Sequence, residues 1–142
     1  MGGIDHLDLV VSDLERSLDF YRGLLEPLGY SRLSEIVGER GEKVLYVGRE
    51  GGTGSVSLRE RQSHAREVPY DRYDLGIHHI AFAAESREVV DKRAAWLRER
   101  GAEIESHPKE YEYTPGYYAV FFNDPDGLKL EIVHRPGGGP CC

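Results

Sequence analysis

Two stretches of the sequence match each other and decide the fold: DHLDLVVSDLERSLDFYRGLLEPLGY at residues 5–30 and HHIAFAAESREVVDKRAAWLRERGAE at residues 78–103. Each reads as a short strand, a polar break, an amphipathic helix, a glycine and the start of a new strand. An offset of 73 residues, from residue 5 to residue 78, takes His6 onto His79. The chain is therefore predicted to contain two copies of one structural module.

Each half continues with three further strand candidates that are separated by turn residues. These candidates are residues 30–37, 42–48 and 55–60 in the first half, and 102–107, 116–122 and 127–134 in the second. The pattern predicts an α+β fold of two tandem βαβββ modules, in which the sheets form one curved mixed surface around a cleft. The modules would span 4–62 and 77–134, joined by a connector at 63–76 and followed by a disordered tail at 135–142.

Helix boundaries are predicted from capping residues. Ser12 followed by Glu15 three residues later is a capping box for the first helix, and the second helix would begin after Ser86. Gly29 and Gly101 would end the two helices. The predicted buried faces are Leu14, Leu18, Tyr21 and Leu25 in the first helix, and Val89, Val90, Ala94 and Leu97 in the second.

The composition excludes several classes of protein. The formal net charge is −7, from 25 acidic and 18 basic residues, which argues against nucleic-acid binding. No apolar run is long enough to span a membrane. The N-terminus lacks the features of a secretory signal, so a cytoplasmic protein is expected. Cys141 and Cys142 have neither a disulfide framework nor metal-binding spacing.

Strand alternation assigns side chains to faces. Neighbouring residues in a strand point to opposite sides, so His79 should face the cleft while His78 has the parity of the core. The same argument places His6 and Glu131 on the cleft side of the first and last strands. Two imidazoles and one carboxylate suit Fe(II), Mn(II), Zn(II), Ni(II) or Co(II). The sequence thus predicts one divalent metal ion held by His6, His79 and Glu131.

The stretches 5–30, GIHHIAFAAES (76–86) and YYAVFFNDPDGLKLEIV (117–133) resemble the vicinal oxygen chelate superfamily. This superfamily includes glyoxalase I, extradiol dioxygenases, methylmalonyl-CoA epimerase, fosfomycin-resistance thiol transferases and bleomycin-resistance proteins. The resemblance implies paired βαβββ modules around an open cleft, and a metal held at the positions of His6, His79 and Glu131. It also implies a homodimer whose metal chelates adjacent oxygens of a small substrate and stabilises the charge that develops on them.

Departures from individual members leave the reaction open. Ser57 stands where glyoxalase I carries a fourth ligand, a glutamate. Phe121 stands where extradiol dioxygenases carry a tyrosine, and no histidine lies between Pro108 and Asn123. Lyase or isomerase chemistry, thiol transfer and dioxygenation therefore all remain as alternatives.

Further residues are candidates for the cleft. Tyr113, in the tyrosine-rich stretch 107–118, is the first candidate for a catalytic hydroxyl, followed by Tyr117 and Tyr118 as substrate-binding residues. Ser57 and Arg59 also have cleft parity and are predicted to bind substrate, although Arg59 could instead pair with a surface carboxylate.

Two rival functions stand beside the metal-dependent enzyme. One is a metal-free protein that sequesters a ligand, as bleomycin-resistance proteins do. The other is a vestigial site that binds metal adventitiously.

Overall fold

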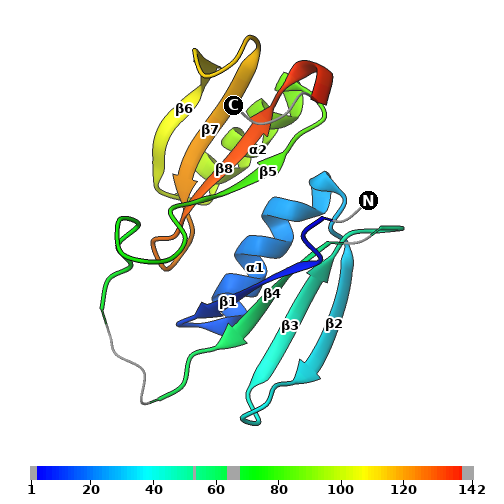
Figure 1. The fold of residues 1–142 in the computed structure, drawn as a ribbon, viewed down its shortest axis with the longest axis vertical. Coiled ribbons are helices and arrows are strands. Elements are labelled where there is room, and N and C mark those ends of the chain that lie inside the picture. The colour runs from blue at the N-terminus through cyan, green and yellow to red at the C-terminus, as the bar shows by residue number, and fades with distance from the viewer. Residues whose placement is uncertain (1–2, 53, 64–67, 139–142) are drawn as a thin grey trace. The chain divides into compact units, whose positions relative to one another are not determined.

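The computed structural model describes residues 3–52, 54–63 and 68–138. The chain divides into two compact units, one ending at Val68 and the other beginning at Pro69, and each is one βαβββ module (Figure 1). The first contains β1 (His6–Val11), α1 (Leu14–Leu25), the 3₁₀ helix η1 (Glu26–Leu28), β2 (Arg32–Val37), β3 (Lys43–Gly48) and β4 (Ser55–Glu60). The second contains β5 (Ile80–Ala83), α2 (Arg87–Glu99), β6 (Ile104–Tyr111), β7 (Tyr117–Asn123), β8 (Lys129–His134) and the 3₁₀ helix η2 (Pro136–Gly138).

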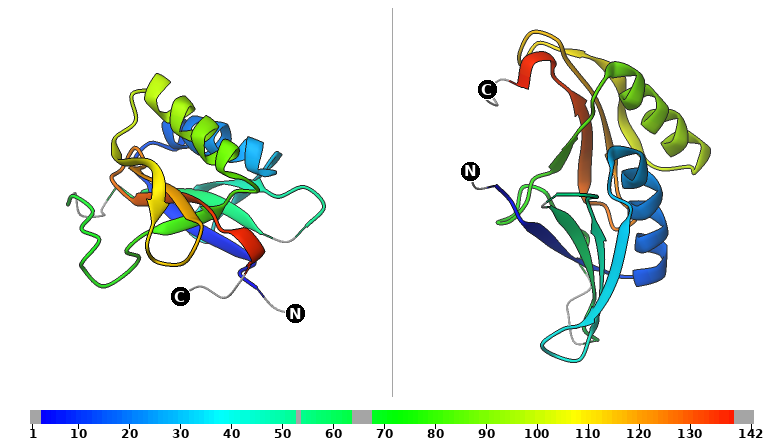
Figure 2. Two further views of the ribbon diagram at one scale, coloured as in Figure 1. Left: turned by 90° about the horizontal axis from the view of Figure 1, so that it is seen from above. Right: turned by 90° about the vertical axis from the view of Figure 1, so that its right-hand side faces the viewer.

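The two modules share one sheet topology, which confirms the predicted fold class. The strand orders are β1-β4-β3-β2 and β5-β8-β7-β6. In each sheet the first strand pairs in parallel with the fourth, and the other pairs are antiparallel. In each module the helix packs on one face of its own sheet, α1 on β3 and β4, and α2 on β6, β7 and β8 (Figure 2). The other face of each sheet carries the alternate side chains of its strands, which point away from the helix.

The first helix begins one residue later than predicted. Asp13, not Ser12, is the N-cap, because Asp13 has an extended backbone and its side chain accepts a hydrogen bond from Arg16 N at 2.9 Å. The buried face is also rotated from the predicted one: Leu14 and Leu18 are only half-buried. The buried residues are Ser17, Phe20, Tyr21, Leu24 and Leu25.

The second helix follows its prediction more closely. Ser86 is the N-cap and accepts a hydrogen bond from Val89 N at 3.3 Å. Its buried residues are Val90, Ala94 and Leu97, while Val89 is half-buried. Gly101 follows the last turn with a φ of 68°, and Gly29 ends η1 with a φ of 91°. No helix in the described part of the chain is long and apolar enough to cross a membrane.

The strand predicted at 102–107 is β6, which instead runs from Ile104 to Tyr111. It continues across Pro108, which has no backbone N–H to donate. Two features accommodate this proline: β6 is an edge strand, and its pairing with β7 shifts register between Ser106 and Lys109. Tyr111 consequently lies on a strand and not in a loop.

Of the tail predicted at 135–142, the structure describes residues up to 138, with η2 at Pro136–Gly138. Residues 139–142, which include both cysteines, lie outside the described part of the chain.

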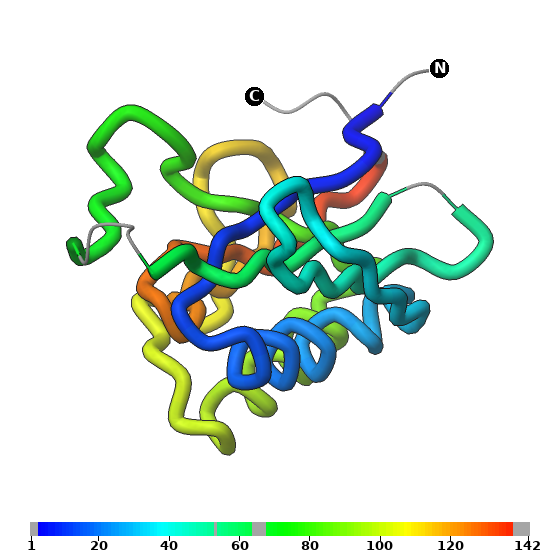
Figure 3. The backbone as a smooth tube through the Cα atoms, turned by 90° about the horizontal axis from the view of Figure 1, so that it is seen from below, coloured from blue at the N-terminus to red at the C-terminus, as the bar shows by residue number. Residues whose placement is uncertain are grey.

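Residues 68–79 form an irregular loop that leads into β5 (Figure 3). An ion-pair network ties this loop to the second sheet. Arg72 donates hydrogen bonds to both carboxylate oxygens of Glu105, one of them at 3.0 Å, and Lys129 Nζ lies 3.3 Å from the same carboxylate. The Arg72 hydrogen bond is the largest cause that lowers the pKa of Glu105, to about 2.

This network predicts a pH-dependent contribution to stability. The pKa of Glu105 is about 2 in the folded chain and ordinarily 4.5, so its ion pairs stabilise the fold above about pH 4.5 and lose that effect as the pH falls towards 2. We expect Glu105→Gln to lower the free energy of unfolding by about 1 kcal/mol at pH 7, and by progressively less below pH 4.5. Urea unfolding at pH 7 and pH 3 measures this, with the exposed Glu103→Gln as control. Equal stability of Glu105→Gln and the wild type at pH 7 would contradict the assignment.

Candidate functional site

The β7–β8 hairpin positions the central residue of the candidate site, Glu131. Its turn is fixed by Asp124, whose carboxylate accepts hydrogen bonds from Asp126 N and Leu128 N, both at 2.9 Å. Gly127, with a φ of 89°, completes the turn. The resulting register pairs Glu131 with Phe121 on β7, while the parallel pairing places it beside Ala81 on β5. Glu131 therefore lies on the middle strand, between two neighbours.

Glu131 is a buried carboxyl group with two polar partners. Its side chain is 1% exposed. The hydroxyl of Tyr117 donates a hydrogen bond to Glu131 Oε1. His79 Nε2 lies 3.3 Å from Glu131 Oε2. Burial raises the pKa of Glu131, whereas the Tyr117 hydroxyl and the His79 ring favour its charged form.

Aromatic side chains extend from this pair across the same face of the sheet. Tyr111 and Tyr113 are stacked with ring centres 5.4 Å apart, and Tyr117 meets the Tyr113 ring edge-on at 5.2 Å. Phe121 meets Tyr111 at 5.3 Å and His79 at 6.3 Å, both edge-on. We call Tyr111, Tyr113, Tyr117 and Phe121 the aromatic cluster. Only Tyr113 is largely exposed, at 60%, so the cluster offers a ligand one open ring.

The adjacent histidines have different surroundings. His79 lies directly before β5 and points its Nε2 towards Glu131, while its Nδ1 lies 2.8 Å from His78 Nδ1. His78 is exposed and meets the ring of Tyr73 at 5.2 Å. The predicted core position of His78 is wrong, because the strand begins only at Ile80 and the alternation does not reach back to residue 78. Loss of surrounding water lowers the pKa of His78, and His79 lowers it further.

In the first module, His6 is the first residue of β1 and its side chain is half-exposed. Its Nδ1 lies 2.8 Å from Asp5 Oδ1, and this hydrogen bond is the main cause that raises the pKa of His6. The predicted parity of β1 is confirmed, since Leu9 and Val11 are buried while His6 is exposed.

Ser57 and Arg59 are both engaged within the first module. Ser57 is buried and its hydroxyl bonds to Leu7 O, at 3.2 Å, and to Asp8. Arg59 forms ion pairs of 2.6 Å with Asp8 and with Glu42. Pairing with carboxylates was the alternative expected for Arg59, and it argues against a free anion-binding guanidinium.

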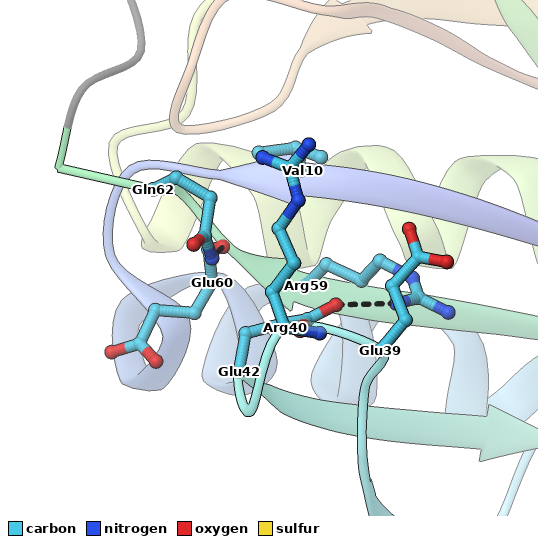
Figure 4. A pocket seen from close by; sticks show the side chains of 7 residues that line it. All are labelled: Val10, Glu39, Arg40, Glu42, Arg59, Glu60 and Gln62. Carbon is cyan, nitrogen blue, oxygen red and sulfur yellow. Dashed lines mark hydrogen bonds and ion pairs between the residues drawn. The ribbon is translucent and has the colours of Figure 1, made fainter.

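A hollow of about 420 Å³ lies beside Arg59 (Figure 4). Glu39, Glu42 and Glu60 contribute to its lining, together with Arg40. Since Arg59 already pairs with Glu42 here, the hollow is poorly suited to an anionic substrate.

Tyr118 belongs to a different surface from Tyr117. Its hydroxyl donates a hydrogen bond of 2.7 Å to Asp91 on α2, and Arg87 lies over its ring at 4.9 Å. This placement on the helix side argues against a substrate-binding role beside Glu131.

The donor atoms of His79 and Glu131 fit a divalent ion. Two ligand bonds of about 2.0–2.2 Å that meet at a right or tetrahedral angle hold their donors about 2.8–3.6 Å apart, and the two donors here are 3.3 Å apart. Within residues 3–52, 54–63 and 68–138, no three His, Cys, Asp or Glu side chains gather as a ligand group. His6 belongs to the first module, so its place in the ligand set stays a prediction.

Sequence reasoning missed part of the site. Phe121 was considered only as a departure from a family pattern, although its alternation with Tyr117 and Ala119 on β7 places all three on one face. Tyr111 was missed because the preceding strand was predicted to end too early. The sequence does not indicate that Asp5 and His78 contact the two histidines, apart from their equivalent places in the internal repeat.

The fold consists of two βαβββ modules, and the second of them carries the carboxylate–histidine pair. Comparison with known sequences gives the family. The chain belongs to the Glyoxalase/Bleomycin resistance protein/Dioxygenase superfamily, whose family model matches residues 3–132.

Individual relatives are similar over nearly their whole length. The uncharacterized protein YqjT of Bacillus subtilis is 31% identical, over 90% of this chain and 95% of that protein. Lactoylglutathione lyase of Neisseria meningitidis is 30% identical, over 94% of this chain and 91% of that protein. A glyoxylase/bleomycin resistance protein/dioxygenase domain from Frankia is 26% identical with a TM-score of 0.75, covering 94% and 98% of the two chains.

The hydrogen bond from Tyr117 predicts a measurable stabilisation. Tyr117→Phe removes the hydroxyl that Glu131 accepts from and leaves a buried oxygen with one partner fewer, so we expect the free energy of unfolding to fall by about 1–3 kcal/mol. Tyr113→Phe, at an exposed ring of the same cluster, is the matched control and should change it by less than about 0.5 kcal/mol. Urea unfolding of the three proteins measures both values. An equal effect of the two substitutions would contradict the role given to Tyr117.

Proposed function

We propose that this chain is a divalent-metal-dependent enzyme that acts on a small oxygenated substrate, with His6, His79 and Glu131 as metal ligands. One observation carries the proposal: a buried carboxylate and an imidazole nitrogen lie 3.3 Å apart on the sheet face opposite α2. Membership of a superfamily with lyases and dioxygenases supports it.

The surroundings of Glu131 favour an added cation. A buried carboxylate is costly unless it is paired and hydrogen-bonded. In the first module, the Asp8 carboxylate forms an ion pair of 2.6 Å with Arg59, which carries a permanent positive charge. Among the described residues, the ion-pair partner of Glu131 is His79, which is charged only when protonated. A divalent ion bound by His79 and Glu131 would supply a permanent positive charge beside the buried carboxylate.

The protein groups have distinct roles in this proposal. A bound divalent ion would supply a Lewis acid that attracts adjacent substrate oxygens and stabilises negative charge on them. Tyr117 holds the Glu131 carboxylate in place through its hydroxyl. The aromatic cluster packs against the apolar part of the substrate and excludes water from it. Tyr113, with the exposed ring, carries the hydroxyl that could hold or release a proton.

The proposal covers lyase or isomerase chemistry, thiol transfer and dioxygenation, because stabilised charge on adjacent oxygens serves all three. The likeness to a lactoylglutathione lyase supports the first of these. Ser57, which occupies the position of that enzyme class's fourth ligand and bonds to Asp8, separates this site from it. We further infer, from the superfamily, a homodimer.

A metal-free ligand-binding protein is the second candidate, and the aromatic cluster favours it. Stacked and edge-on rings bind flat or cationic ligands without any ion. The exposed Tyr113 ring provides such a surface.

Metal binding separates the two candidates. We expect the untagged full chain to bind about one Fe(II), Mn(II), Ni(II), Zn(II) or Co(II) per chain, and His79→Ala and Glu131→Gln to lose this ion because each removes a ligand. Elemental analysis and titration calorimetry measure the stoichiometry. His107→Ala, which removes an exposed histidine on β6, is the matched control and should bind as the wild type does. Failure of the wild type to bind any of the five ions would make metal-free ligand binding the better account.

A further inference from the structure

We infer that Asp5 and His78 are positioning residues that orient the two predicted histidine ligands. Each lies directly before a histidine and holds its Nδ1, which leaves Nε2 for the ion. This inference rests on the proposed metal-dependent function and assigns the residues that prepare the ligands for it.

The contact in the first module sets the tautomer of His6. Asp5 Oδ1 and His6 Nδ1 are 2.8 Å apart. A carboxylate only accepts hydrogen bonds, and a neutral imidazole carries one N–H. The proton of neutral His6 therefore lies on Nδ1, and the lone pair of Nε2 is free to bind a metal.

The contact in the second module orients His79 in the same way. His79 Nδ1 lies 2.8 Å from His78 Nδ1, on the opposite side of the ring from the Nε2 that faces Glu131. When Nε2 acts as the ligand, Nδ1–H donates to His78 Nδ1, and the proton of His78 lies on its own Nε2. The ring of Tyr73 packs edge-on against His78.

The connector loop supports His78. Tyr73 follows Arg72, which is paired with Glu105 on β6, and Tyr70 donates its hydroxyl to the carbonyl of Ile77. The position of His78 is therefore tied to the second sheet through this loop.

The internal repeat makes the two contacts equivalent. The same offset of 73 residues that takes His6 onto His79 takes Asp5 onto His78. In both modules, the residue that precedes the histidine is bonded to the Nδ1 of that histidine. This residue supplies a carboxylate in the first module and an imidazole in the second. Partners of this kind commonly contribute about 10–100-fold to metal affinity.

The experiment compares Zn(II) binding by the full-length wild type, Asp5→Ala and His78→Ala with that of the rescue variants Asp5→Asn and His78→Asn. The amide oxygen of Asn keeps an acceptor beside Nδ1, whereas Ala removes it. His107→Ala and His79→Ala serve as the neutral and ligand-loss controls. The readouts are the Zn(II) dissociation constant by chelator competition, the thermal midpoint of the metal-free proteins, and the protonated nitrogen of His6 by ¹⁵N NMR at a pH where the ring is neutral.

We expect both Ala variants to bind Zn(II) about tenfold or more weakly, the Asn variants to recover most of that loss, and the thermal midpoints to stay unchanged. Wild-type affinity in both Ala variants, with binding lost in His79→Ala, would overturn the positioning roles while leaving the metal site intact. Should the wild type bind no Zn(II), the proposed function fails, and the NMR spectrum decides the part assigned to Asp5. A proton on Nδ1 of His6 that is lost in Asp5→Ala upholds it, and a proton on Nε2 in the wild type overturns it.

Discussion

The burial of the Glu131 carboxyl is the constraint on which the rest of the account depends. Such a group is tolerated only where partners compensate for the water that it loses. The β7–β8 hairpin supplies Tyr117, and the entry to β5 supplies His79. Both reach Glu131 because β8 is a middle strand with a neighbour on each side. The site is thus a consequence of strand order as much as of residue type.

The two modules carry different side chains at equivalent positions of their sheets. Ser57 occupies the place on β4 that Glu131 occupies on β8, as the parallel registers show, with Asp8 beside Ser57 and Ala81 beside Glu131. The first module combines a buried hydroxyl with a carboxylate that Arg59 neutralises. The second combines a buried carboxylate with an imidazole that is charged only when protonated. One copy of the repeat thus neutralises its carboxylate with an arginine, whereas in the other copy the ion-pair partner of Glu131 among the described residues is His79.

The sequence predicted much of this arrangement because repeats and alternation are local signals. The two βαβββ modules and the face of β1 that carries His6 followed from them. The errors lie where tertiary contacts override local patterns. Asp13 and not Ser12 caps α1, β6 crosses Pro108, and His78 precedes the strand to which it was assigned. The depth of Glu131 and the opposite settings of Tyr117 and Tyr118 depend on packing that no single-sequence pattern reports.

Anomalous X-ray scattering from crystals of the full chain grown with Zn(II) tests the central claim most directly. We expect one strong peak within about 2.0–2.2 Å of a Glu131 carboxylate oxygen and of His79 Nε2, with Nδ1 of His79 still bonded to His78. The same peak would show whether His6 completes the ligand set. Zinc bound elsewhere, with His79 and Glu131 free of it, would contradict the claim that this buried carboxylate and its histidine form a metal site.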